Sequence, residues 1–503
     1  MLVTKLASTT ITLFYCLTIG SCSKLLKGGT IVFFDSQAGG LKVIRDGSIL
    51  ITGDSITSIF STASPEGISP DTEVVDCANK IITPGFIDTH RHGWQTVFKT
   101  LGSNTTLAEY AFRYGASVAE PLFTPEDLYI SQLTGIYEAL AAGVTTTLDH
   151  AHHTWTAEHS EAGLNASIDS GARVFFAYTF QNSSATFGVP EQIAQWRELA
   201  SKISSNLTKL AIAYDDWTGN PHGADTLSVI DLVLNGNASL LTAHSVEGAW
   251  SFGDPPEDLH KAGVLNISLP VVLSHTSYLT PRGAGLLRST NQYISITPES
   301  EMHYGHLHPT SHLIMDQASL GVDTHFTFST DILTQARLWL QSTRAVVFKE
   351  TLDRWEVPGK SPFSVNQAFL LATRNGGLAL GRSDLGVISE NAKADLVVWD
   401  GRSPALLGWS DPVAAVILHA SVGDIVHVLV NGEFKKRDGK LAIEGYAGIQ
   451  DRFLESAGRI QAALKAIPGP PQDGDFLPGR HYGYVPQLDV QRGEGTGYGP
   501  SFV

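Results

Sequence analysis

Cysteine is scarce in this chain, and its scarcity limits both the cross-links and the kinds of metal site that the fold can contain. The 503 residues include three cysteines, Cys16, Cys22 and Cys77. Three cysteines cannot build the dense disulfide framework that supports small secreted domains, and none of them forms a Cys-x-x-Cys zinc motif. The fold must therefore be stabilised by a buried core.

Positive charge is also lacking. Lys and Arg total 34 against 50 Asp and Glu, which gives a net charge of -16, and no basic run occurs. Nucleic acids and anionic membranes need clustered basic side chains, so we expect a small-molecule substrate, no nucleic acid and no membrane partner once a leader is removed. Homo-oligomerisation remains open. The hydrophobic content of 43% and charged content of 17% are typical of a globular protein with one large domain and a satellite.

Residues 1–22 are predicted to be a secretory signal peptide. Lys5 precedes a mostly apolar run at residues 6–20, and small residues follow. The run is too short for a spanning helix. A misassigned start and a short membrane anchor are the alternatives, and Ile-Gly-Ser-Cys at 19–22 also resembles a lipoprotein cleavage site.

Strand-like segments lie near both ends of the chain. Near the N-terminus the predicted strands are Thr30–Phe34, Ser48–Thr52 and Ser55–Ile59. A similar stretch near the C-terminus contains Asp395–Trp399 and Asp424–Val430, and Asn431-Gly432 is a strong hairpin turn. They predict one small β-sandwich domain built from both ends. The predicted division is a signal peptide (1–22), the first part of the small β domain (23–84), a catalytic barrel (85–384), the second part of the β domain (385–445), and a C-terminal helix with a Pro/Gly-rich tail (446–503) that wraps the surface or is disordered.

The middle of the chain alternates strands and helices. The predicted strands are Phe86–His92, Val144–His150, Ala172–Phe180, Lys209–Asp215, Ser239–Ser245, Pro270–Thr276, Gln292–Thr297 and His325–Asp331. The clearest helix follows Thr124, which is expected to cap it, and ends at Gly143. Eight β/α units over roughly 250 residues predict an α/β fold of the TIM-type (β/α)8 class, with active residues at the carboxyl ends of the strands.

Six Asn-x-Ser/Thr sequons favour a eukaryotic secretory route over a lipoprotein. They begin at Asn104, Asn165, Asn182, Asn206, Asn237 and Asn266. The last three shortly precede predicted barrel strands and so belong to the face opposite the catalytic mouth. We therefore expect a secreted or secretory-pathway glycoprotein.

A histidine or a carboxylate closes several of the predicted strands. They are His90 and His92 in strand one, His244 with Glu247 in strand five, His275 in strand six and Asp331 in strand eight. Residues i and i+2 of a strand point the same way, so His90 and His92 project together. Because barrel strands converge at their carboxyl ends, three histidines and an aspartate suit a metal with an open water position. Taken singly, His244 can be a core histidine and Asp331 a helix N-cap.

Three motifs resemble those of the metal-dependent amidohydrolase superfamily. They are Pro-Gly-Phe-Ile-Asp-Thr-His-Arg-His at 84–92, Ala-Gly-Val-Thr-Thr-Thr-Leu-Asp at 142–149 and Ala-Lys-Ala-Asp-Leu-Val-Val at 392–398. The chain is most similar to the mononuclear branch that contains S-adenosylhomocysteine and methylthioadenosine deaminases, guanine and cytosine deaminases and triazine hydrolases. The resemblance covers nearly all of residues 25–445.

The resemblance implies a role for each strand-end residue. His90, His92, His244 and Asp331 correspond to the metal ligands, Asp331 also takes the proton of the hydrolytic water, His275 orients that water, and Glu247 shuttles a proton. Binuclear members have a carbamylated lysine at the end of strand four, where this chain has Tyr-Asp-Asp-Trp at 214–217. One divalent metal ion per chain is therefore implied, with zinc favoured over iron.

Other polar and aromatic residues are candidates for the substrate pocket. They are Trp94, His150, His152, Glu299, Glu301 and Tyr304. Solvated loop histidines and core aromatics are the alternatives. Residues 297–306 depart from the Pro-x-Ser-Asn pattern common in nucleoside-type deaminases, which puts an adenosine-like substrate in doubt.

The sequence thus predicts a metal-dependent hydrolase of a non-peptide C–N bond, with deamination of an aminated N-heterocycle as the leading reaction. Amide or lactam hydrolysis is the alternative within the superfamily. A non-catalytic amidohydrolase-like binding protein would be expected to lack metal ligands, and a surface-associated interaction protein is the third alternative.

Overall fold

The computed structural model describes residues 23–182 and 186–485. The predicted signal peptide and the last part of the predicted tail lie outside these residues. No helix in the described part of the chain combines the length and apolar character needed to cross a membrane.

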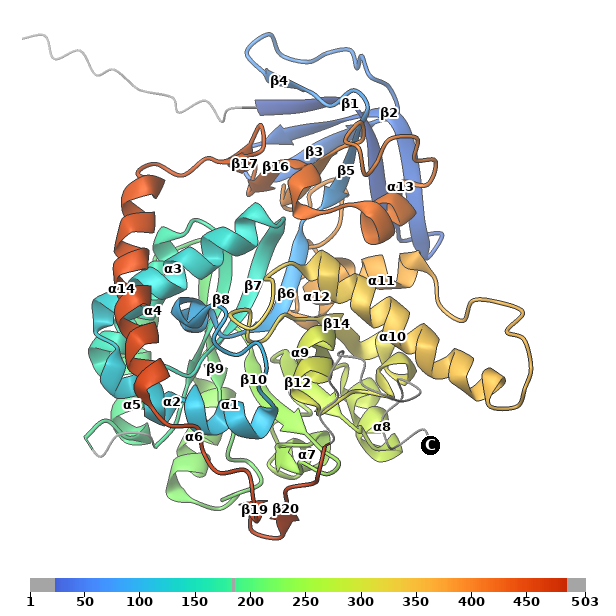
Figure 1. Cartoon of the computed structure of the whole chain (residues 1–503). Helices are drawn as coiled ribbons and strands as arrows, with labels where there is room; N and C mark the ends of the chain where they lie inside the picture. Colours follow the sequence, from blue (N-terminus) through green and yellow to red (C-terminus); the bar gives the residue numbers. More distant parts are fainter. Residues whose placement is uncertain (1–22, 183–185, 486–503) are drawn as a thin grey trace, which may run out of the picture.

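Eight parallel strands form a nearly closed barrel in chain order. They are β6 (Phe86–Arg91), β7 (Val144–Ala151), β8 (Arg173–Thr179), β9 (Thr208–Ala213), β10 (Leu241–Val246), β12 (Val271–Ser277), β13 (Tyr293–Ile296) and β14 (Ala318–Leu320), and β11 (Phe252–Gly253) pairs with β10. The larger helices around them are α3 (Pro125–Ala141), α4 (Ala157–Asp169), α5 (Val189–Lys202), α6 (Ala224–Asn235), α8 (Pro281–Thr290) and α10 (Ile332–Leu352). Figure 1 shows these helices around the strands. The predicted TIM-type barrel is confirmed.

The shorter helices decorate the barrel and its junction with the second sheet. They are α1 (Leu107–Arg113), α2 (Ala116–Ala119), α7 (Pro256–Lys261), α9 (Pro298–Tyr304), α11 (Val365–Ala372), α12 (Arg374–Ala379) and α13 (Pro412–Ala414).

The helix predicted after Thr124 is α3, and its cap explains where it begins. Asp127 N donates to Thr124 Oγ1 at 3.2 Å, and Thr124 N donates to Asp127 Oδ2 at 2.8 Å. This reciprocal capping box satisfies two backbone donors that a helix start leaves unpaired. Gly143, with φ of 82°, then turns the chain into β7.

The prediction of the eighth strand is wrong. His325–Asp331 is a turn-rich segment, and the strand is the earlier, shorter β14. Barrel closure continues past β14 through the backbone, because Asp323 N donates to the carbonyl oxygen of His90 at 2.8 Å and His92 N donates to that of Asp323 at 3.2 Å. In this segment Phe326 packs against Phe98, with ring centroids 5.5 Å apart.

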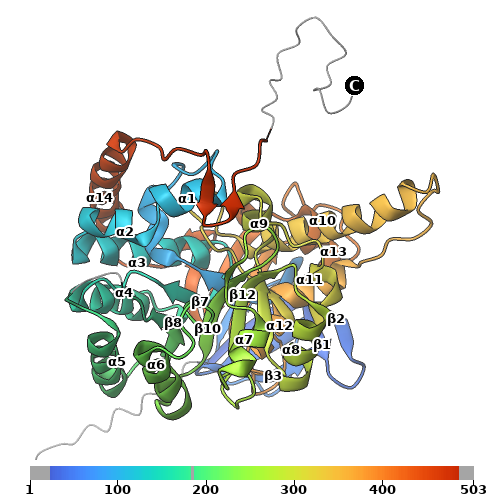
Figure 2. The ribbon, with the colours of Figure 1, turned by 90° about the horizontal axis from the view of Figure 1, so that it is seen from below.

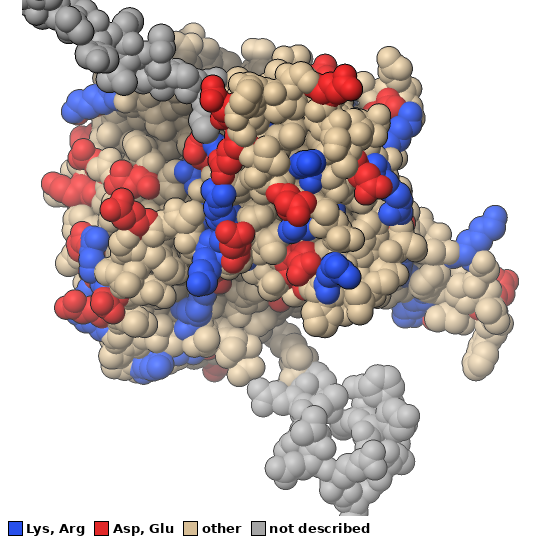
Figure 3. Space-filling view, turned by 90° about the horizontal axis from the view of Figure 1, so that it is seen from above, with Lys and Arg blue, Asp and Glu red and all other residues tan. Residues whose placement is uncertain are grey.

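The second domain is one nine-stranded sheet that joins the two ends of the chain, as predicted. Its strands are β1 (Ser23–Asp35), β2 (Gly40–Thr52), β3 (Ser55–Phe60), β4 (Glu73–Asp76), β5 (Lys80–Pro84), β15 (Leu396–Asp400), β16 (Ile425–Val430), β17 (Glu433–Arg437) and β18 (Lys440–Leu441). The ends meet where β15 pairs with β5, and Asn431 and Gly432 turn the chain between β16 and β17 with φ of 49° and 76°. Figure 3 looks onto this side of the molecule, where basic and acidic side chains are intermingled.

The C-terminal segment crosses to the opposite side of the barrel. The predicted helix is α14 (Tyr446–Ala466), and the tail beyond it forms a short hairpin, β19 (Asp475–Leu477) and β20 (Arg480–His481), where we expected an extended tail or disorder. Figure 2 shows the hairpin on the side of the barrel mouth, near α1. Phe476 anchors it, with ring centroids 5.8 Å from Phe112 and 5.6 Å from Trp250.

Candidate metal centre and active site

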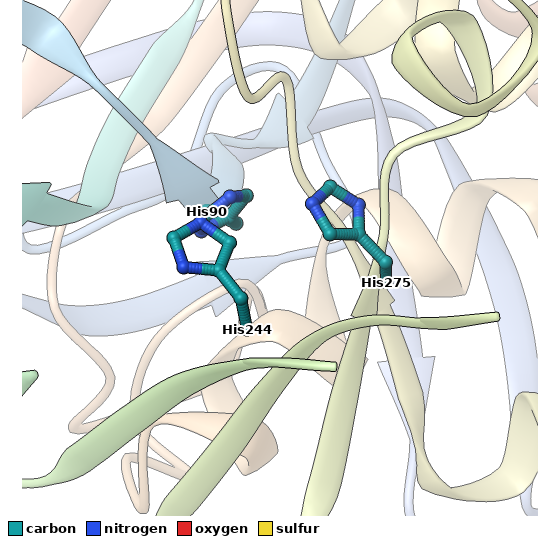
Figure 4. Close-up of side chains that lie close together, drawn as sticks. All are labelled: His90, His244 and His275. Atoms are coloured by element: carbon teal, nitrogen blue, oxygen red, sulfur yellow. The ribbon is translucent and has the colours of Figure 1, made fainter. Parts of the chain in front are cut away.

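Four histidines and one aspartate meet at the carboxyl ends of the barrel strands. They are His90 on β6, His92 just after β6, His244 on β10, His275 on β12 and Asp323 just after β14. Figure 4 shows His90, His244 and His275 converging from separate strands. Their ring nitrogens lie within 4.8 Å of one another, and so do the ligand atoms of His90, His92 and Asp323.

The spacing of the donor atoms fits a metal ion. Asp323 Oδ1 lies 3.4 Å from His90 Nε2 and 3.2 Å from His92 Nε2, and His92 Nε2 lies 3.3 Å from His244 Nε2. Ligands about 2.0–2.1 Å from a tetrahedral zinc ion lie about 3.3 Å from one another. Buried His90 Nε2 also has no hydrogen-bond partner among the described residues, as expected of an atom that binds a metal.

The outward ring nitrogens of these histidines are held by the protein. His92 Nδ1 donates to the carbonyl oxygen of His150 at 2.9 Å, His244 Nδ1 donates to Asp215 Oδ2 at 2.8 Å, and His90 Nδ1 lies 2.8 Å from Ser274 Oγ. An acceptor-only partner fixes the proton on Nδ1 of His92 and His244, which leaves Nε2 free to coordinate. Burial lowers the pKa of His90 well below its usual value, so this ring is neutral and competent to bind a metal.

Asp323 occupies the place that we predicted for Asp331. Burial alone would raise the pKa of Asp323, but the adjacent rings of His90 and His92 hold it well below its usual range, so the carboxylate is ionised. Asp331 instead caps α10, with Thr334 N donating to its Oδ1 at 2.5 Å. The placement of Asp331 among the histidines was therefore wrong, and its alternative as an N-cap is correct.

A weak sequence pattern marks Asp323. The short run Ala-Ser-Leu-Gly-Val at 318–322 ends in this aspartate, as other apolar strands here end in a histidine. Ser319 and Gly321 interrupt the run, so its periodicity is poorer than that of the segment at 325–331.

His275 reaches the cluster through an unusual backbone conformation. His275 and Thr276 have φ of 67° and 54°, where β12 and β10 slip out of register. Non-glycine residues in the left-handed region are uncommon and concentrate at functional sites. The resulting bulge directs the ring toward His90, with centroids 5.1 Å apart, and His275 Nδ1 lies 2.8 Å from Thr297 Oγ1.

Glu247 lies farther along the loop that follows β10. It is partly buried, and burial raises its pKa, as do the nearby charges of Glu257 and Asp258, while Arg480 lowers it. Within the described residues it makes no hydrogen bond or ion pair. Its proton-shuttling role stays a prediction.

The end of β9 adds Asp215, which the sequence did not assign, and the end of β7 supplies two of the predicted pocket candidates, His150 and His152. Asp215 accepts from His244 and lies 3.2 Å from Nε2 of His150, a buried histidine whose pKa falls to about 4 because of burial. His152 accepts a hydrogen bond from Trp94 Nε1 at 3.2 Å, and its ring centroid is 4.0 Å from that of His92. His150 and His152 thus border the cluster.

The remaining pocket candidates divide between core and site. Trp94 and Tyr304 are fully buried, and Trp94 packs on Phe98. Both therefore match the alternative that these aromatic residues belong to the core. Glu299 accepts from Gln335 Nε2 at 3.0 Å, and burial raises its pKa to about 7. Glu301 lies beside His275, with Oε1 and Nδ1 3.9 Å apart.

Curated proteins similar to this chain are deaminases. A 5-methylthioadenosine/S-adenosylhomocysteine deaminase of Pelotomaculum thermopropionicum is 26% identical over 420 residues, covering 81% of this chain and 92% of that protein. A 5'-deoxyadenosine deaminase of Methanothermobacter thermautotrophicus is 25% identical over 85% of this chain and 96% of its own length.

Solved structures share the fold at lower identity. An adenosine deaminase from Xanthomonas campestris with bound zinc superposes with a TM-score of 0.73 at 17% identity, covering 88% of this chain and 99% of that one. Atrazine chlorohydrolase from Arthrobacter aurescens, complexed with zinc, gives 0.72 at 18% identity over 86% of this chain and 100% of that one.

A family model decides the assignment. The amidohydrolase family model matches residues 81–219 and 241–435, which include every histidine and carboxylate of the metal cluster. The matched ranges take in most of the barrel and the returning strands β15 and β16. The chain therefore belongs to the amidohydrolase family.

Proposed function

We propose that this protein is a metal-dependent hydrolase that deaminates an aminated N-heterocycle. The observation that carries the proposal is the set of His90, His92, His244 and Asp323, whose donor atoms have metal-ligand spacing, with His275 beside them. The deaminase names of the similar proteins support the same reaction class.

The four donors would hold one divalent ion, with zinc the best match to three imidazoles and a carboxylate. A bound ion supplies a water of lowered pKa and a Lewis acid for the developing negative charge. In the described residues no lysine lies at the end of β9, where Asp215 instead bonds to His244. This arrangement supports a single ion.

The side chains of this protein would manage the proton and the attacking oxygen. Ionised Asp323 is placed to accept a proton from water, and Ser300 Oγ steadies its other oxygen by donating to Oδ2 at 2.5 Å. His275 presents Nε2 to the cluster and would hold the oxygen. Glu247, with a pKa raised by burial, would carry a proton to the departing nitrogen.

The proposed substrate class depends on the reaction type and on one sequence difference from the nucleoside-type deaminases. Glu301 stands where the Pro-x-Ser-Asn pattern has its asparagine, so an adenosine-like substrate is not assumed. The test is ammonia release by the zinc-loaded protein from a panel of aminated purines, pyrimidines and triazines. Ammonia together with the hydroxylated ring supports deamination. Hydrolysis of amides or lactams without ammonia from any ring overturns it in favour of the alternative.

We also propose that the mature protein is exported and glycosylated. All six sequon asparagines are exposed, and Asn206, Asn237 and Asn266 precede β9, β10 and β12 on the side away from the metal cluster. Glycans there would not obstruct the mouth. Intact-mass analysis before and after deglycosylation is expected to show an N-terminus near residue 23 and a mass loss; an intact Met1 without a mass change contradicts export.

A further inference from the structure

The C-terminal hairpin, formed by β19 and β20, lies between α1 and α9 on the mouth side of the barrel (Figure 2). The amidohydrolase family model ends at residue 435, so α14 and this hairpin lie outside the matched ranges. The family assignment therefore gives the hairpin no role, and its own contacts have to explain why it lies at the mouth.

An anchored helix and a stiff linker carry the hairpin to this position. Arg459 of α14 donates a hydrogen bond to Asp127 of α3, and Gln461 Nε2 donates to the carbonyl oxygen of Val97 at 2.8 Å. After α14, residues 468–471 read Pro-Gly-Pro-Pro, and proline-rich linkers are extended and semi-rigid. The hairpin is thus held at the end of an arm whose base is fixed to the barrel.

The hairpin is bonded to itself and has few bonds to its surroundings. Tyr482 N donates to the carbonyl oxygen of Gly474 at 2.9 Å, and His481 pairs with Asp475 across the two strands. In the described part of the chain, no hydrogen bond or ion pair joins residues 474–482 to the rest of the protein. Segments with so few bonds to the core open at low free energy. The hairpin can therefore move as a unit.

The side chain of Phe476 attaches the hairpin to the mouth. Its ring centroid lies 5.8 Å from that of Phe112 on α1 and 5.6 Å from that of Trp250. The segment with α1 follows β6 and Trp250 follows β10, and these are the first and fifth strands of the eight-stranded barrel, so they face each other across it. Trp250 Nε1 also donates to the carbonyl oxygen of Gly305, at the end of α9, at 3.2 Å. Phe476 therefore bridges segments that leave opposite sides of the barrel.

The hairpin also brings a positive charge to the mouth. Arg480 is exposed, and its guanidinium group has no hydrogen bond or ion pair within the described residues. Its charge acts on Glu247 in the loop after β10, and the other charges that act there are those of Glu257 and Asp258. These acidic groups would repel an approaching anion, whereas Arg480 would attract one.

We propose that the C-terminal hairpin is a gate on the barrel mouth, and that Arg480 makes this gate favour ligands with a negative charge. The gate is closed in this structure, and opening it breaks the two ring contacts of Phe476. A ligand at the closed gate meets the guanidinium group of Arg480, so an anionic substituent gains an attraction that a neutral ligand does not. The proposal concerns access to the metal cluster and holds for any reaction there.

The first test measures how fast zinc leaves the zinc-loaded protein to 1,10-phenanthroline, a neutral planar chelator. The zinc retained after rapid desalting gives the rate. An aromatic pair shifts an opening equilibrium by about 2- to 10-fold, so Phe476→Ser, which loses two pairs, should release zinc about 4- to 100-fold faster. Phe476→Tyr keeps the ring, and Leu477→Ser changes the adjacent exposed side chain, so both should match wild type. An unchanged rate in Phe476→Ser, or an equal rise in Leu477→Ser, overturns the gate.

The second test repeats the measurement with pyridine-2,6-dicarboxylate, a planar chelator with two carboxylates. Arg480→Gln should slow zinc release to this dianion by about three- to tenfold and leave the rate with phenanthroline unchanged. Arg402→Gln is the matched control, because it removes the same charge from an exposed position just after β15, in the second sheet. Equal rates for the two arginine variants, or slowing with both chelators, overturns the selection by charge.

Hydrogen–deuterium exchange separates gating from a general loosening of the fold. Phe476→Ser should speed exchange in the hairpin and in the loop that contains Trp250, and should leave the barrel strands unchanged. Faster exchange throughout the barrel would assign the zinc loss to destabilisation and overturn the gate. Gated zinc release from a protein that deaminates no ring refutes the proposed function and leaves the gate standing. Deamination without gating refutes the gate alone.

Discussion

The carboxylate of Asp215 accepts two hydrogen bonds from His244, one from its backbone N–H at 2.7 Å and one from ring Nδ1 at 2.8 Å. Burial alone would raise the pKa of Asp215, but the adjacent His244 and His150 keep it well below its usual value. An anionic acceptor at Nδ1 fixes the tautomer and increases the basicity of Nε2. Asp215 therefore orients the ring of His244 within the histidine cluster.

Asp215→Asn is expected to lower zinc affinity by about 10–100-fold while the fold persists. The amide keeps the size of the side chain but removes the charge that supports His244. Competition with a chromophoric chelator measures the affinity. Asp216→Asn is the matched control, because Asp216 is exposed and bonds to no histidine among the described residues. Equal affinities for both variants and wild type would contradict the supporting role of Asp215.

Replacing each of the two candidate aspartates by alanine shows which one is the metal ligand and which one caps a helix. Asp323→Ala removes a donor atom from the cluster and should abolish stoichiometric zinc binding. Asp331→Ala should retain the metal and lose about 1 kcal/mol of unfolding free energy, because it deletes the N-cap of α10. Metal content by elemental analysis and urea unfolding are the measurements. Zinc loss from Asp331→Ala alone would reverse the assignment.

The sequence predicts those structural features that depend on residues close together in the chain. Thr124 and Asp127 form a capping box three residues apart, and His90 and His92 lie two residues apart at the end of β6, so both pairs can be predicted from spacing. Asp323 is less readable, because β14 has three residues and its place is set by backbone hydrogen bonds to distant His90.

Long-range contacts explain the other omissions. Nothing local distinguishes Asp215 from Asp216; the choice depends on β9 lying beside β10. The turn of the His275 ring depends on a register shift between β10 and β12. Residue type and strand order therefore predict which side chains gather at the mouth, but tertiary pairing decides which atoms meet.

A buried ion pair fastens the barrel to the second sheet. Arg173 at the start of β8 donates to Asp395 through Nε at 3.0 Å and through a terminal nitrogen at 3.2 Å, and both side chains are 2% exposed. Arg173→Met leaves a buried carboxylate without its cation, so we expect a loss of about 3–5 kcal/mol in unfolding free energy. Arg197→Met breaks an exposed pair with Asp231 and should cost less than about 1 kcal/mol. Comparable unfolding curves for the two variants would show that Arg173 does not fasten the domains.

The variant Glu247→Gln tests how the proton reaches the departing nitrogen. Glu247 lies beyond the end of β10, three residues after His244, and is partly buried, and this burial raises the pKa of its carboxyl group. Glu247→Gln keeps the size and hydrogen-bonding capacity of the side chain but cannot transfer a proton. Positioned proton transfer typically contributes about 10²–10⁴ in rate, so we expect a kcat loss of that order with unchanged metal content.

His244→Ala should instead lose the metal, because it removes a donor atom of the cluster. Turnover and zinc content are measured on both variants. Arg480→Gln is a further comparison, since Arg480 on the C-terminal hairpin lowers the pKa of Glu247. Its removal should raise that pKa and move the alkaline limit of kcat, where Glu247 loses its proton, to higher pH. If Glu247→Gln keeps the wild-type rate, and Arg480→Gln keeps the wild-type pH profile, the proton must come from another group.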